Sequence, residues 1–162
     1  MGKAIYEGNK RCGEPLSMPS TIDFEQEQAD EVAALSEIWP GFSTLAKAWG
    51  KHEYSVRIAP SLPEAEVFTR ITVIFSLPAK YPLVAPVLRL EAAQNLTEAH
   101  VRELLSCMLV RAQRLAGDTV YMHDLLMIAQ EFVSSHNRSP AKSLWESMQS
   151  AERKVRLMQI NY

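Results

Sequence analysis

The sequence predicts an α+β fold in which an antiparallel meander of three or four strands packs on helices. Three observations predict it: residues 52–77 alternate apolar and polar side chains, helical apolar stripes lie on both sides of that stretch, and two closely spaced prolines interrupt the chain after it. The expected order is helix, three or four strands, two helices, and a further helix at the C-terminus. A sheet with helices on one face is the α+β solution for this order.

The composition is that of a globular chain, with 162 residues, 47% hydrophobic and 22% charged. The net charge of −2 gives no bulk electrostatic case for binding nucleic acid or a membrane surface. No apolar run approaches the ~20 residues of a transmembrane helix. The two cysteines, Cys12 and Cys107, are far apart, which indicates reduced thiols in a cytoplasmic protein.

Residues 1–21 are expected to be a flexible leader, because they contain several Gly and Pro residues and show no period. Residues 22–39 predict the first helix, which Pro40 and Gly41 end. Six acidic side chains and no basic one lie between residues 21 and 39, which leaves two interpretations open: a solvated face, or a docking surface for a basic partner. One side of the helix collects large apolar residues, namely Val32, Leu35, Ile38 and Trp39.

The middle of the chain predicts the strands. Residues 41–50 are a loop or contain a short strand, and the pattern does not decide between them. Residues 52–60 and 65–77 predict two strands of a hairpin, and residues 87–91 predict another after the prolines. Alternate residues of the longer strand would face the core, namely Val67, Thr69, Ile71, Val73, Phe75 and Leu77.

Residues 80–90 read K-Y-P-L-V-A-P-V-L-R-L and predict a compact series of turns. Pro82 and Pro86 fix φ and remove two backbone donors, so neither a helix nor a central strand can cross them. Tyr81 combines a large apolar ring with a hydroxyl, and a buried Tyr usually finds a hydrogen-bond partner. These three residues are therefore assigned a structural role.

Two helices are predicted after the strands. Asn95 or Thr97 caps the first, and Gly117 is expected to end it in a left-handed conformation. Asp118 or Thr119 is expected to cap the next helix, which Asn137 closes. Residues 138–162 are predicted to form a linker and an amphipathic helix with an apolar stripe. Three roles stay open for this helix: docking on the domain, pairing with a second chain, or continuation into a longer helix. That stripe contains Leu144, Met148, Ala151, Val155 and Met158.

The sequence shows no pattern of catalytic or metal-binding residues. Cys107 falls in the middle of a helix beside leucines and a methionine, so we expect a small core or half-core residue and not a nucleophile. The four histidines lack zinc-ligand spacing, and His123 is expected on a helix surface or in its first turn. No Gly-rich phosphate loop is present. We therefore predict no catalytic residue, no metal and no cofactor.

Two motifs resemble those of the RWD domain, an α+β module related in fold to ubiquitin-conjugating enzymes. Y-P-x-x-x-P over residues 81–86 is similar to its signature, and residues 28–39 are similar to its opening Q-x-x-E-x-x-x-L-x-x-I-Y, with Trp39 in place of Tyr. The resemblance places an RWD domain over residues 22–137. The His-Pro-Asn tripeptide that precedes the catalytic Cys in conjugating enzymes is absent, which implies an inactive relative.

A third match indicates a particular branch of the family. Residues 131–144 read E-F-V-S-S-H-N-R-S-P-A-K-S-L and resemble the end of the N-terminal RWD domain in the general-control, amino-acid starvation kinase of translation initiation factor two alpha. The resemblance implies a non-catalytic docking module that tethers the kinase to its activator, a large helical-repeat, ribosome-associated protein. It implies a cytoplasmic role in translation control, with ribosomes contacted only indirectly.

Acidic and amide side chains of two helices are the candidate partner-binding residues. We expect Glu31 and Glu37 to project from the first helix, and Gln130 and Glu131 to lie away from the apolar side of the third. Three alternatives stay open: a free-standing RWD protein that binds a translation-associated GTPase, a non-catalytic platform of a ubiquitin or SUMO pathway, and an active conjugating enzyme that uses Cys107. Self-association through the C-terminal helix also stays open.

Overall fold

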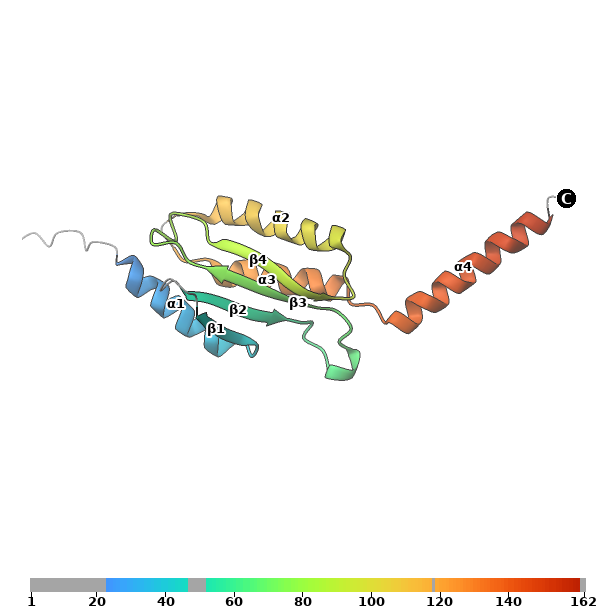
Figure 1. Cartoon of the computed structure of the whole chain (residues 1–162), viewed down its shortest axis with the longest axis horizontal. Helices are drawn as coiled ribbons and strands as arrows, with labels where there is room; N and C mark the ends of the chain where they lie inside the picture. The colour runs from blue at the N-terminus through green and yellow to red at the C-terminus, as the bar shows by residue number, and fades with distance from the viewer. Residues whose placement is uncertain (1–22, 47–51, 118, 161–162) are drawn as a thin grey trace, which may run out of the picture.

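The computed structural model describes residues 23–46, 52–117 and 119–160, and within them the strands form one antiparallel sheet in the order β1-β2-β3-β4 (Figure 1). This is the predicted α+β meander, and the stretch 41–50, which the sequence left open, supplies β1. The strands are β1 Phe42–Ala46, β2 His52–Ile58, β3 Arg70–Ser76 and β4 Val87–Gln94.

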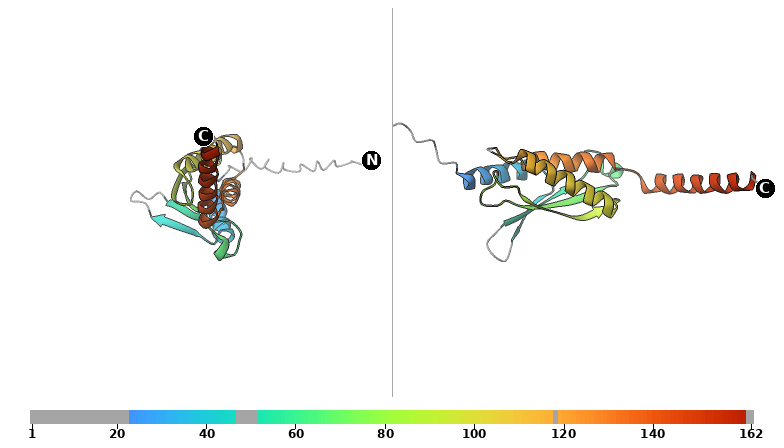
Figure 2. Two further views of the ribbon diagram at one scale, coloured as in Figure 1. Left: turned by 90° about the vertical axis from the view of Figure 1, so that its right-hand side faces the viewer. Right: turned by 90° about the horizontal axis from the view of Figure 1, so that it is seen from above.

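Three helices cover one face of the sheet, and a fourth extends away from it (Figure 2). None of the described helices is long and apolar enough to cross a membrane. The predicted leader, residues 1–21, lies outside the described part of the chain. The division into a leader, a domain over 22–137 and a tail over 138–162 stays a prediction. The helices are α1 Phe24–Ile38, α2 Glu98–Leu115, α3 Met122–Ser135 and α4 Pro140–Ile160.

The core lies between the sheet and the covering helices. Alternate residues of β2 and β3 enter it, as the period of two predicts, and each is at most 1% exposed: Val56, Ile58, Ile71, Val73 and Phe75. The helices contribute a second set, which includes Leu35, Leu104, Met108, Leu125, Leu126 and Val133. The other face of the sheet carries mostly polar side chains. Its apolar residues include Ile74, which is buried at 5% exposure, and the exposed Leu45 and Val87.

Helix α1 buries less of its apolar side than the sequence predicts. Asp23 caps its start by accepting a hydrogen bond from the Gln26 N–H at 3.2 Å. Leu35 and Trp39 are buried, but Ile38 is 54% exposed. Leu35 and Trp39, four residues apart, therefore face the core, whereas Ile38, three residues after Leu35, does not.

Strand β3 begins at Arg70 and not at residue 65 as predicted, because another segment uses the backbone before it. Residues Glu64–Glu66 form a short 3-10 turn. Asn137 Oδ1 then accepts hydrogen bonds from the N–H groups of Phe68 and Thr69, at 2.8 and 3.1 Å. The amide group of Asn137 donates to Glu66 O at 2.8 Å. These backbone groups are satisfied by one side chain, so the strand starts only after them.

The ends of α2 differ in how well the sequence predicts them. Thr97 caps its start, as expected, with its hydroxyl accepting from the His100 N–H at 3.2 Å. Gly117 does not end it in a left-handed conformation, because its φ lies outside the positive region and Ala116 is the cap. The N–H of Gly117 donates to Pro82 O at 3.1 Å, which ties this end of α2 to the proline segment.

Candidate functional site

The proline segment is a compact series of turns, as predicted, with Tyr81 fully buried in its centre. Backbone N–H groups of Tyr81 and Leu83 donate to the carbonyls three residues earlier, at 2.9 and 2.8 Å. The peptide bond between Tyr81 and Pro82 is cis. Pro82 and Pro86 are also buried, while Leu83 and Val84 between them are exposed. The ring of Tyr81 lies in the core, and its hydroxyl reaches the start of α3.

Tyr81 and Glu31 together cap the N-terminus of α3. The Tyr81 hydroxyl accepts hydrogen bonds from the N–H groups of Tyr121 and Met122, at 2.7 and 2.9 Å. It donates to Glu31 Oε1 at 3.1 Å, and the same oxygen accepts from the Met122 N–H at 2.7 Å. The expected cap at Thr119 is wrong, because the cap residue is Tyr121 and its side chain makes no cap bond; the other expected cap, Asp118, lies outside the described residues. A helix start in the core needs such acceptors.

Glu31 is a buried structural residue, which corrects the expectation that it projects from α1. Its side chain is only 7% exposed. Burial raises the pKa of the Glu31 carboxyl, while the hydrogen bonds from Tyr81 and from the backbone at the start of α3 oppose the rise. The spacing could have indicated this, because Glu31, Leu35 and Trp39 recur every four residues and share the buried face.

Gln28 holds the other end of the proline segment. Its Nε2 donates to Pro78 O at 2.9 Å and to Tyr81 O at 3.1 Å. Gln28 and Glu31 are three residues apart, so one face of α1 binds both the backbone and the side-chain hydroxyl of Tyr81. The structure thereby explains why the pattern Q-x-x-E and the pattern Y-P occur in the same chain.

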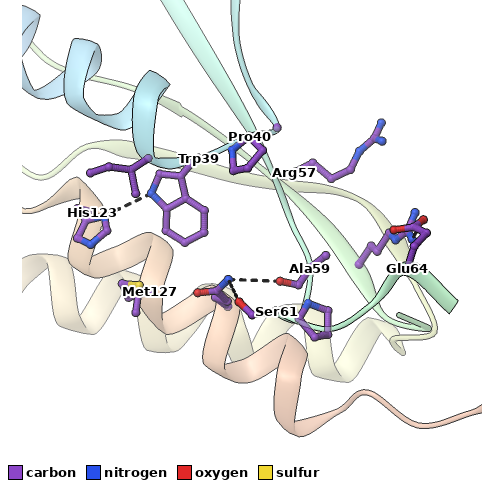
Figure 3. A pocket seen from close by; sticks show the side chains of 13 residues that line it. Trp39, Pro40, Arg57, Ala59, Ser61, Glu64, His123 and Met127 are labelled. Carbon is purple, nitrogen blue, oxygen red and sulfur yellow. Dashed lines mark hydrogen bonds and ion pairs between the residues drawn. The ribbon is translucent and has the colours of Figure 1, made fainter. Parts of the chain in front are cut away.

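Two adjoining pockets lie along the surface where α1 meets α3, and both are lined by Ile38 and His123. The first holds about 610 Å³ and continues towards the segment after β2 (Figure 3). At its edge Trp39 Nε1 donates to His123 Nδ1 at 3.3 Å. The second pocket, of about 570 Å³, is lined by acidic residues of α1 and by the segment before α3.

The other predicted partner-binding residues are spread around this surface. Gln130 lines the first pocket, and its Nε2 donates to Ser61 Oγ at 3.1 Å. Glu131, the next residue of α3, is exposed. Glu37 is exposed on α1 beside Ile38. The structure thus brings Gln130 close to the end of α1, and it leaves Glu37 and Glu131 accessible on two helices.

A model of the RWD domain family matches residues 26–133, which include most of α1, the sheet, α2 and most of α3. The chain belongs to the RWD domain family. The two motifs found in the sequence contact each other in the fold, because Gln28 and Glu31 of the first motif both hydrogen-bond to Tyr81 of the second. The RWD domain is a non-catalytic module of the ubiquitin-conjugating-enzyme-like fold and serves in protein–protein interaction.

Three comparisons relate this RWD domain to one kinase. The chain is 31% identical over 97 residues to the eIF-2-alpha kinase GCN2 of Rattus norvegicus, and 32% identical over 83 residues to that of Mus musculus. These matches cover 58% and 51% of the chain but only 6% and 5% of the kinases. The solution structure of the RWD domain of mouse GCN2 matches with a TM-score of 0.67 and 27% identity, over 78% of this chain and 96% of that one.

Cys107 lies outside the predicted core, which corrects another expectation. Its side chain is exposed on α2, while the buried stripe of that helix passes through Leu104, Met108 and Ala112. Cys107 directly precedes Met108, and successive residues of an α-helix are rotated by about 100°. The Cys107 side chain is therefore directed away from the buried stripe. Within the described ranges, no group of three or more His, Cys, Asp or Glu side chains could hold a metal ion.

Proposed function

We propose that this RWD domain docks a starvation-responsive kinase of translation initiation factor two alpha onto the large helical-repeat, ribosome-associated activator of that kinase. Docking would raise the effective concentration of the kinase near the signal that the activator carries. The proposal includes a cytoplasmic location and no direct contact with nucleic acid. The observation that carries it is the match to the GCN2 RWD domain, which extends over 96% of that domain's structure.

The surface formed by α1 and α3 supports a docking role. It exposes Ile38 and Met127, which are 54% and 46% exposed, beside a pocket of about 610 Å³. Exposed apolar side chains with an acidic rim are typical of a surface that a partner covers. We take as this rim the exposed acidic residues Glu37 of α1 and Glu131 of α3. We therefore propose Glu37, Gln130 and Glu131 as partner contacts, and assign Glu31 to the support of the helix that carries two of them.

Reversing one rim charge tests this surface. In co-precipitation of the activator, Glu131→Lys should weaken binding about fivefold or more, on the order of 1 kcal/mol, because the rim charge orients the partner. The melting temperature should stay within about 2 °C, since Glu131 is exposed. Glu103→Lys on the exposed side of α2 is the matched control and should bind normally. Equal binding by both variants would remove Glu131 from the surface.

A further inference from the structure

The second pocket between α1 and α3 combines acidic and apolar walls. Its acidic lining comes from Glu27, Asp30 and Glu31 of α1. Its apolar lining comes from Ala34, Leu35 and Ile38 of the same helix and from Val120 in the segment before α3. Ile38 and Val120 are 54% and 37% exposed. The pocket holds about 570 Å³, enough for a few side chains of another segment.

Two carboxylate oxygens of this pocket are buried without a hydrogen-bond partner in the described part of the chain. They are Glu27 Oε2 and Glu31 Oε2, four residues apart on one side of α1. The Glu31 residue is only 7% exposed, and its other oxygen is already used at the start of α3. A buried acceptor is disfavoured until a donor reaches it, and a cationic donor suits a carboxylate best. A basic side chain is therefore the kind of group that this pocket would bind most favourably.

Helix α4 of the same chain has the complementary chemistry. It extends away from the domain (Figures 1 and 2) and exposes Leu144, Met148 and Val155 by 55–64%. At 100° per residue these three lie on one stripe of the helix, Lys154 and Arg156 lie on its two flanks, and Arg153 lies on the opposite side. An exposed amphipathic helix of this kind gains stability by burying its stripe against another surface.

We propose that α4 of one copy of this chain docks in the α1–α3 pocket of a second copy. Arg156 and Lys154 would pair with the carboxylates of Glu27 and Glu31 in the pocket wall, while Val155 and Met148 would cover Ile38 and Val120. The exchange is reciprocal, so two copies form a closed dimer. It goes beyond the docking function proposed above and does not depend on it, although both occupants would cover Ile38.

The position of α4 favours a second copy over the chain's own pocket. The pocket lies at the N-terminal end of α3, where Val120 and His123 line it. Helix α4 follows the C-terminal end of α3, and the 14 residues between the two ends span about 20 Å. It also points away from the domain from that end (Figure 1). A second copy can present its α4 to the pocket directly, whereas the chain's own α4 would have to fold back along α3.

Sedimentation equilibrium of the full chain tests the proposal. A dimer should form with rising protein concentration at 50 mM NaCl, and 500 mM NaCl should weaken it because ion pairs contribute. Glu27→Lys or Arg156→Glu alone should raise the dissociation constant about tenfold, and the two together should restore much of the loss. Arg153→Glu is the matched control and should leave the dimer unchanged.

Two outcomes would overturn the proposal. One is a monomer at every concentration up to the millimolar range. The other is a dimer that Glu27→Lys and Arg156→Glu leave intact, as expected if α4 pairs with α4 of the second copy instead. Circular dichroism of each variant tests whether its domain is folded. Because Arg156 lies on an exposed helix, its variant tests the contact even if Glu27→Lys unfolds.

Discussion

Two tyrosine rings pack against each other in the core, and only one of their two hydroxyl groups is hydrogen-bonded within the described residues. The rings of Tyr81 and Tyr121 have centroids 5.1 Å apart, and both side chains are at most 3% exposed. The Tyr81 hydroxyl takes part in three hydrogen bonds at the start of α3. The Tyr121 hydroxyl is buried and has no partner within the described residues. The pair separates the contribution of a satisfied hydroxyl from that of an unsatisfied one in the same surroundings.

Tyr81→Phe should lower the free energy of unfolding by about 1–3 kcal/mol, because it leaves the Tyr121 N–H without its acceptor in the core. Tyr121→Phe should be neutral or stabilising, since it removes a buried hydroxyl that has no partner. Urea denaturation of the two variants measures both changes. A larger loss for Tyr121→Phe than for Tyr81→Phe would contradict the assignment of Tyr81 as the cap.

Glu31 makes the stability of the domain depend on pH. Burial raises the pKa of its carboxyl in the folded state, so the unfolded chain releases this proton first as pH rises. The Glu31 contribution to the free energy of unfolding therefore falls from about pH 4.3, the ordinary value for Glu, until pH passes the raised pKa.

The Glu31→Gln variant lacks this titrating carboxyl, so comparing it with the natural chain isolates the contribution of Glu31 to the pH dependence of stability. The free energy of unfolding of the variant minus that of the natural chain should increase as pH rises from 4 towards 8. Urea denaturation at several pH values gives the difference, in which the other carboxyls cancel. A difference that is constant or decreases over this range would show that the folded-state pKa of Glu31 is not raised.

At the scale of elements, Gly41 sets how closely the chain after α1 approaches the sheet. Its carbonyl accepts a hydrogen bond from the Arg57 N–H at 3.3 Å. A Cβ at residue 41 would lie 2.8 Å from the Arg57 Cβ and 3.1 Å from its backbone N and O. The close approach lets α1 lead directly into β1 beside β2.

Gly41→Ala should therefore destabilise the domain by about 1–3 kcal/mol, because the backbone of β2 must move to admit the methyl group. Gly117→Ala is the matched control. A Cβ at Gly117 would meet nothing closer than the Leu115 carbonyl oxygen at 3.8 Å, and its φ is not positive, so the change should cost less than about 0.5 kcal/mol. Thermal unfolding compares the two, and equal losses would contradict this account of Gly41.

For the molecule as a whole, local patterns predict the elements, and long-range contacts decide their ends. The period of two in β2 and β3, the cap at Thr97 and the turns around Tyr81 were predictable because each depends on neighbouring residues. The start of β3 depends on Asn137, about 70 residues away. The start of α3 depends on Glu31 and Tyr81, at distances of 91 and 41 residues. No local rule contains these contacts.

The candidate site was predictable only in part, for the same reason. Exposed positions such as Glu37 and Glu131 follow from helical periodicity. The four-residue spacing of α1 could have indicated that Glu31 is buried, but its bonds to Tyr81 and to the start of α3 are long-range contacts. The exposure of Ile38 likewise depends on how α1 packs in the fold. Acid content suggested a docking helix, but the structure separates the acids that support the fold from those that a partner can reach.

The most direct test of the docking function is a pull-down from amino-acid-starved cell lysate with this chain as bait, read by mass spectrometry. The account predicts that the large helical-repeat activator is recovered with ribosomal proteins, and that Glu131→Lys reduces both while Glu103→Lys does not. Recovery of a translation-associated GTPase or of ubiquitin-pathway proteins, without the activator, would contradict the docking proposal and leave the RWD fold unaffected.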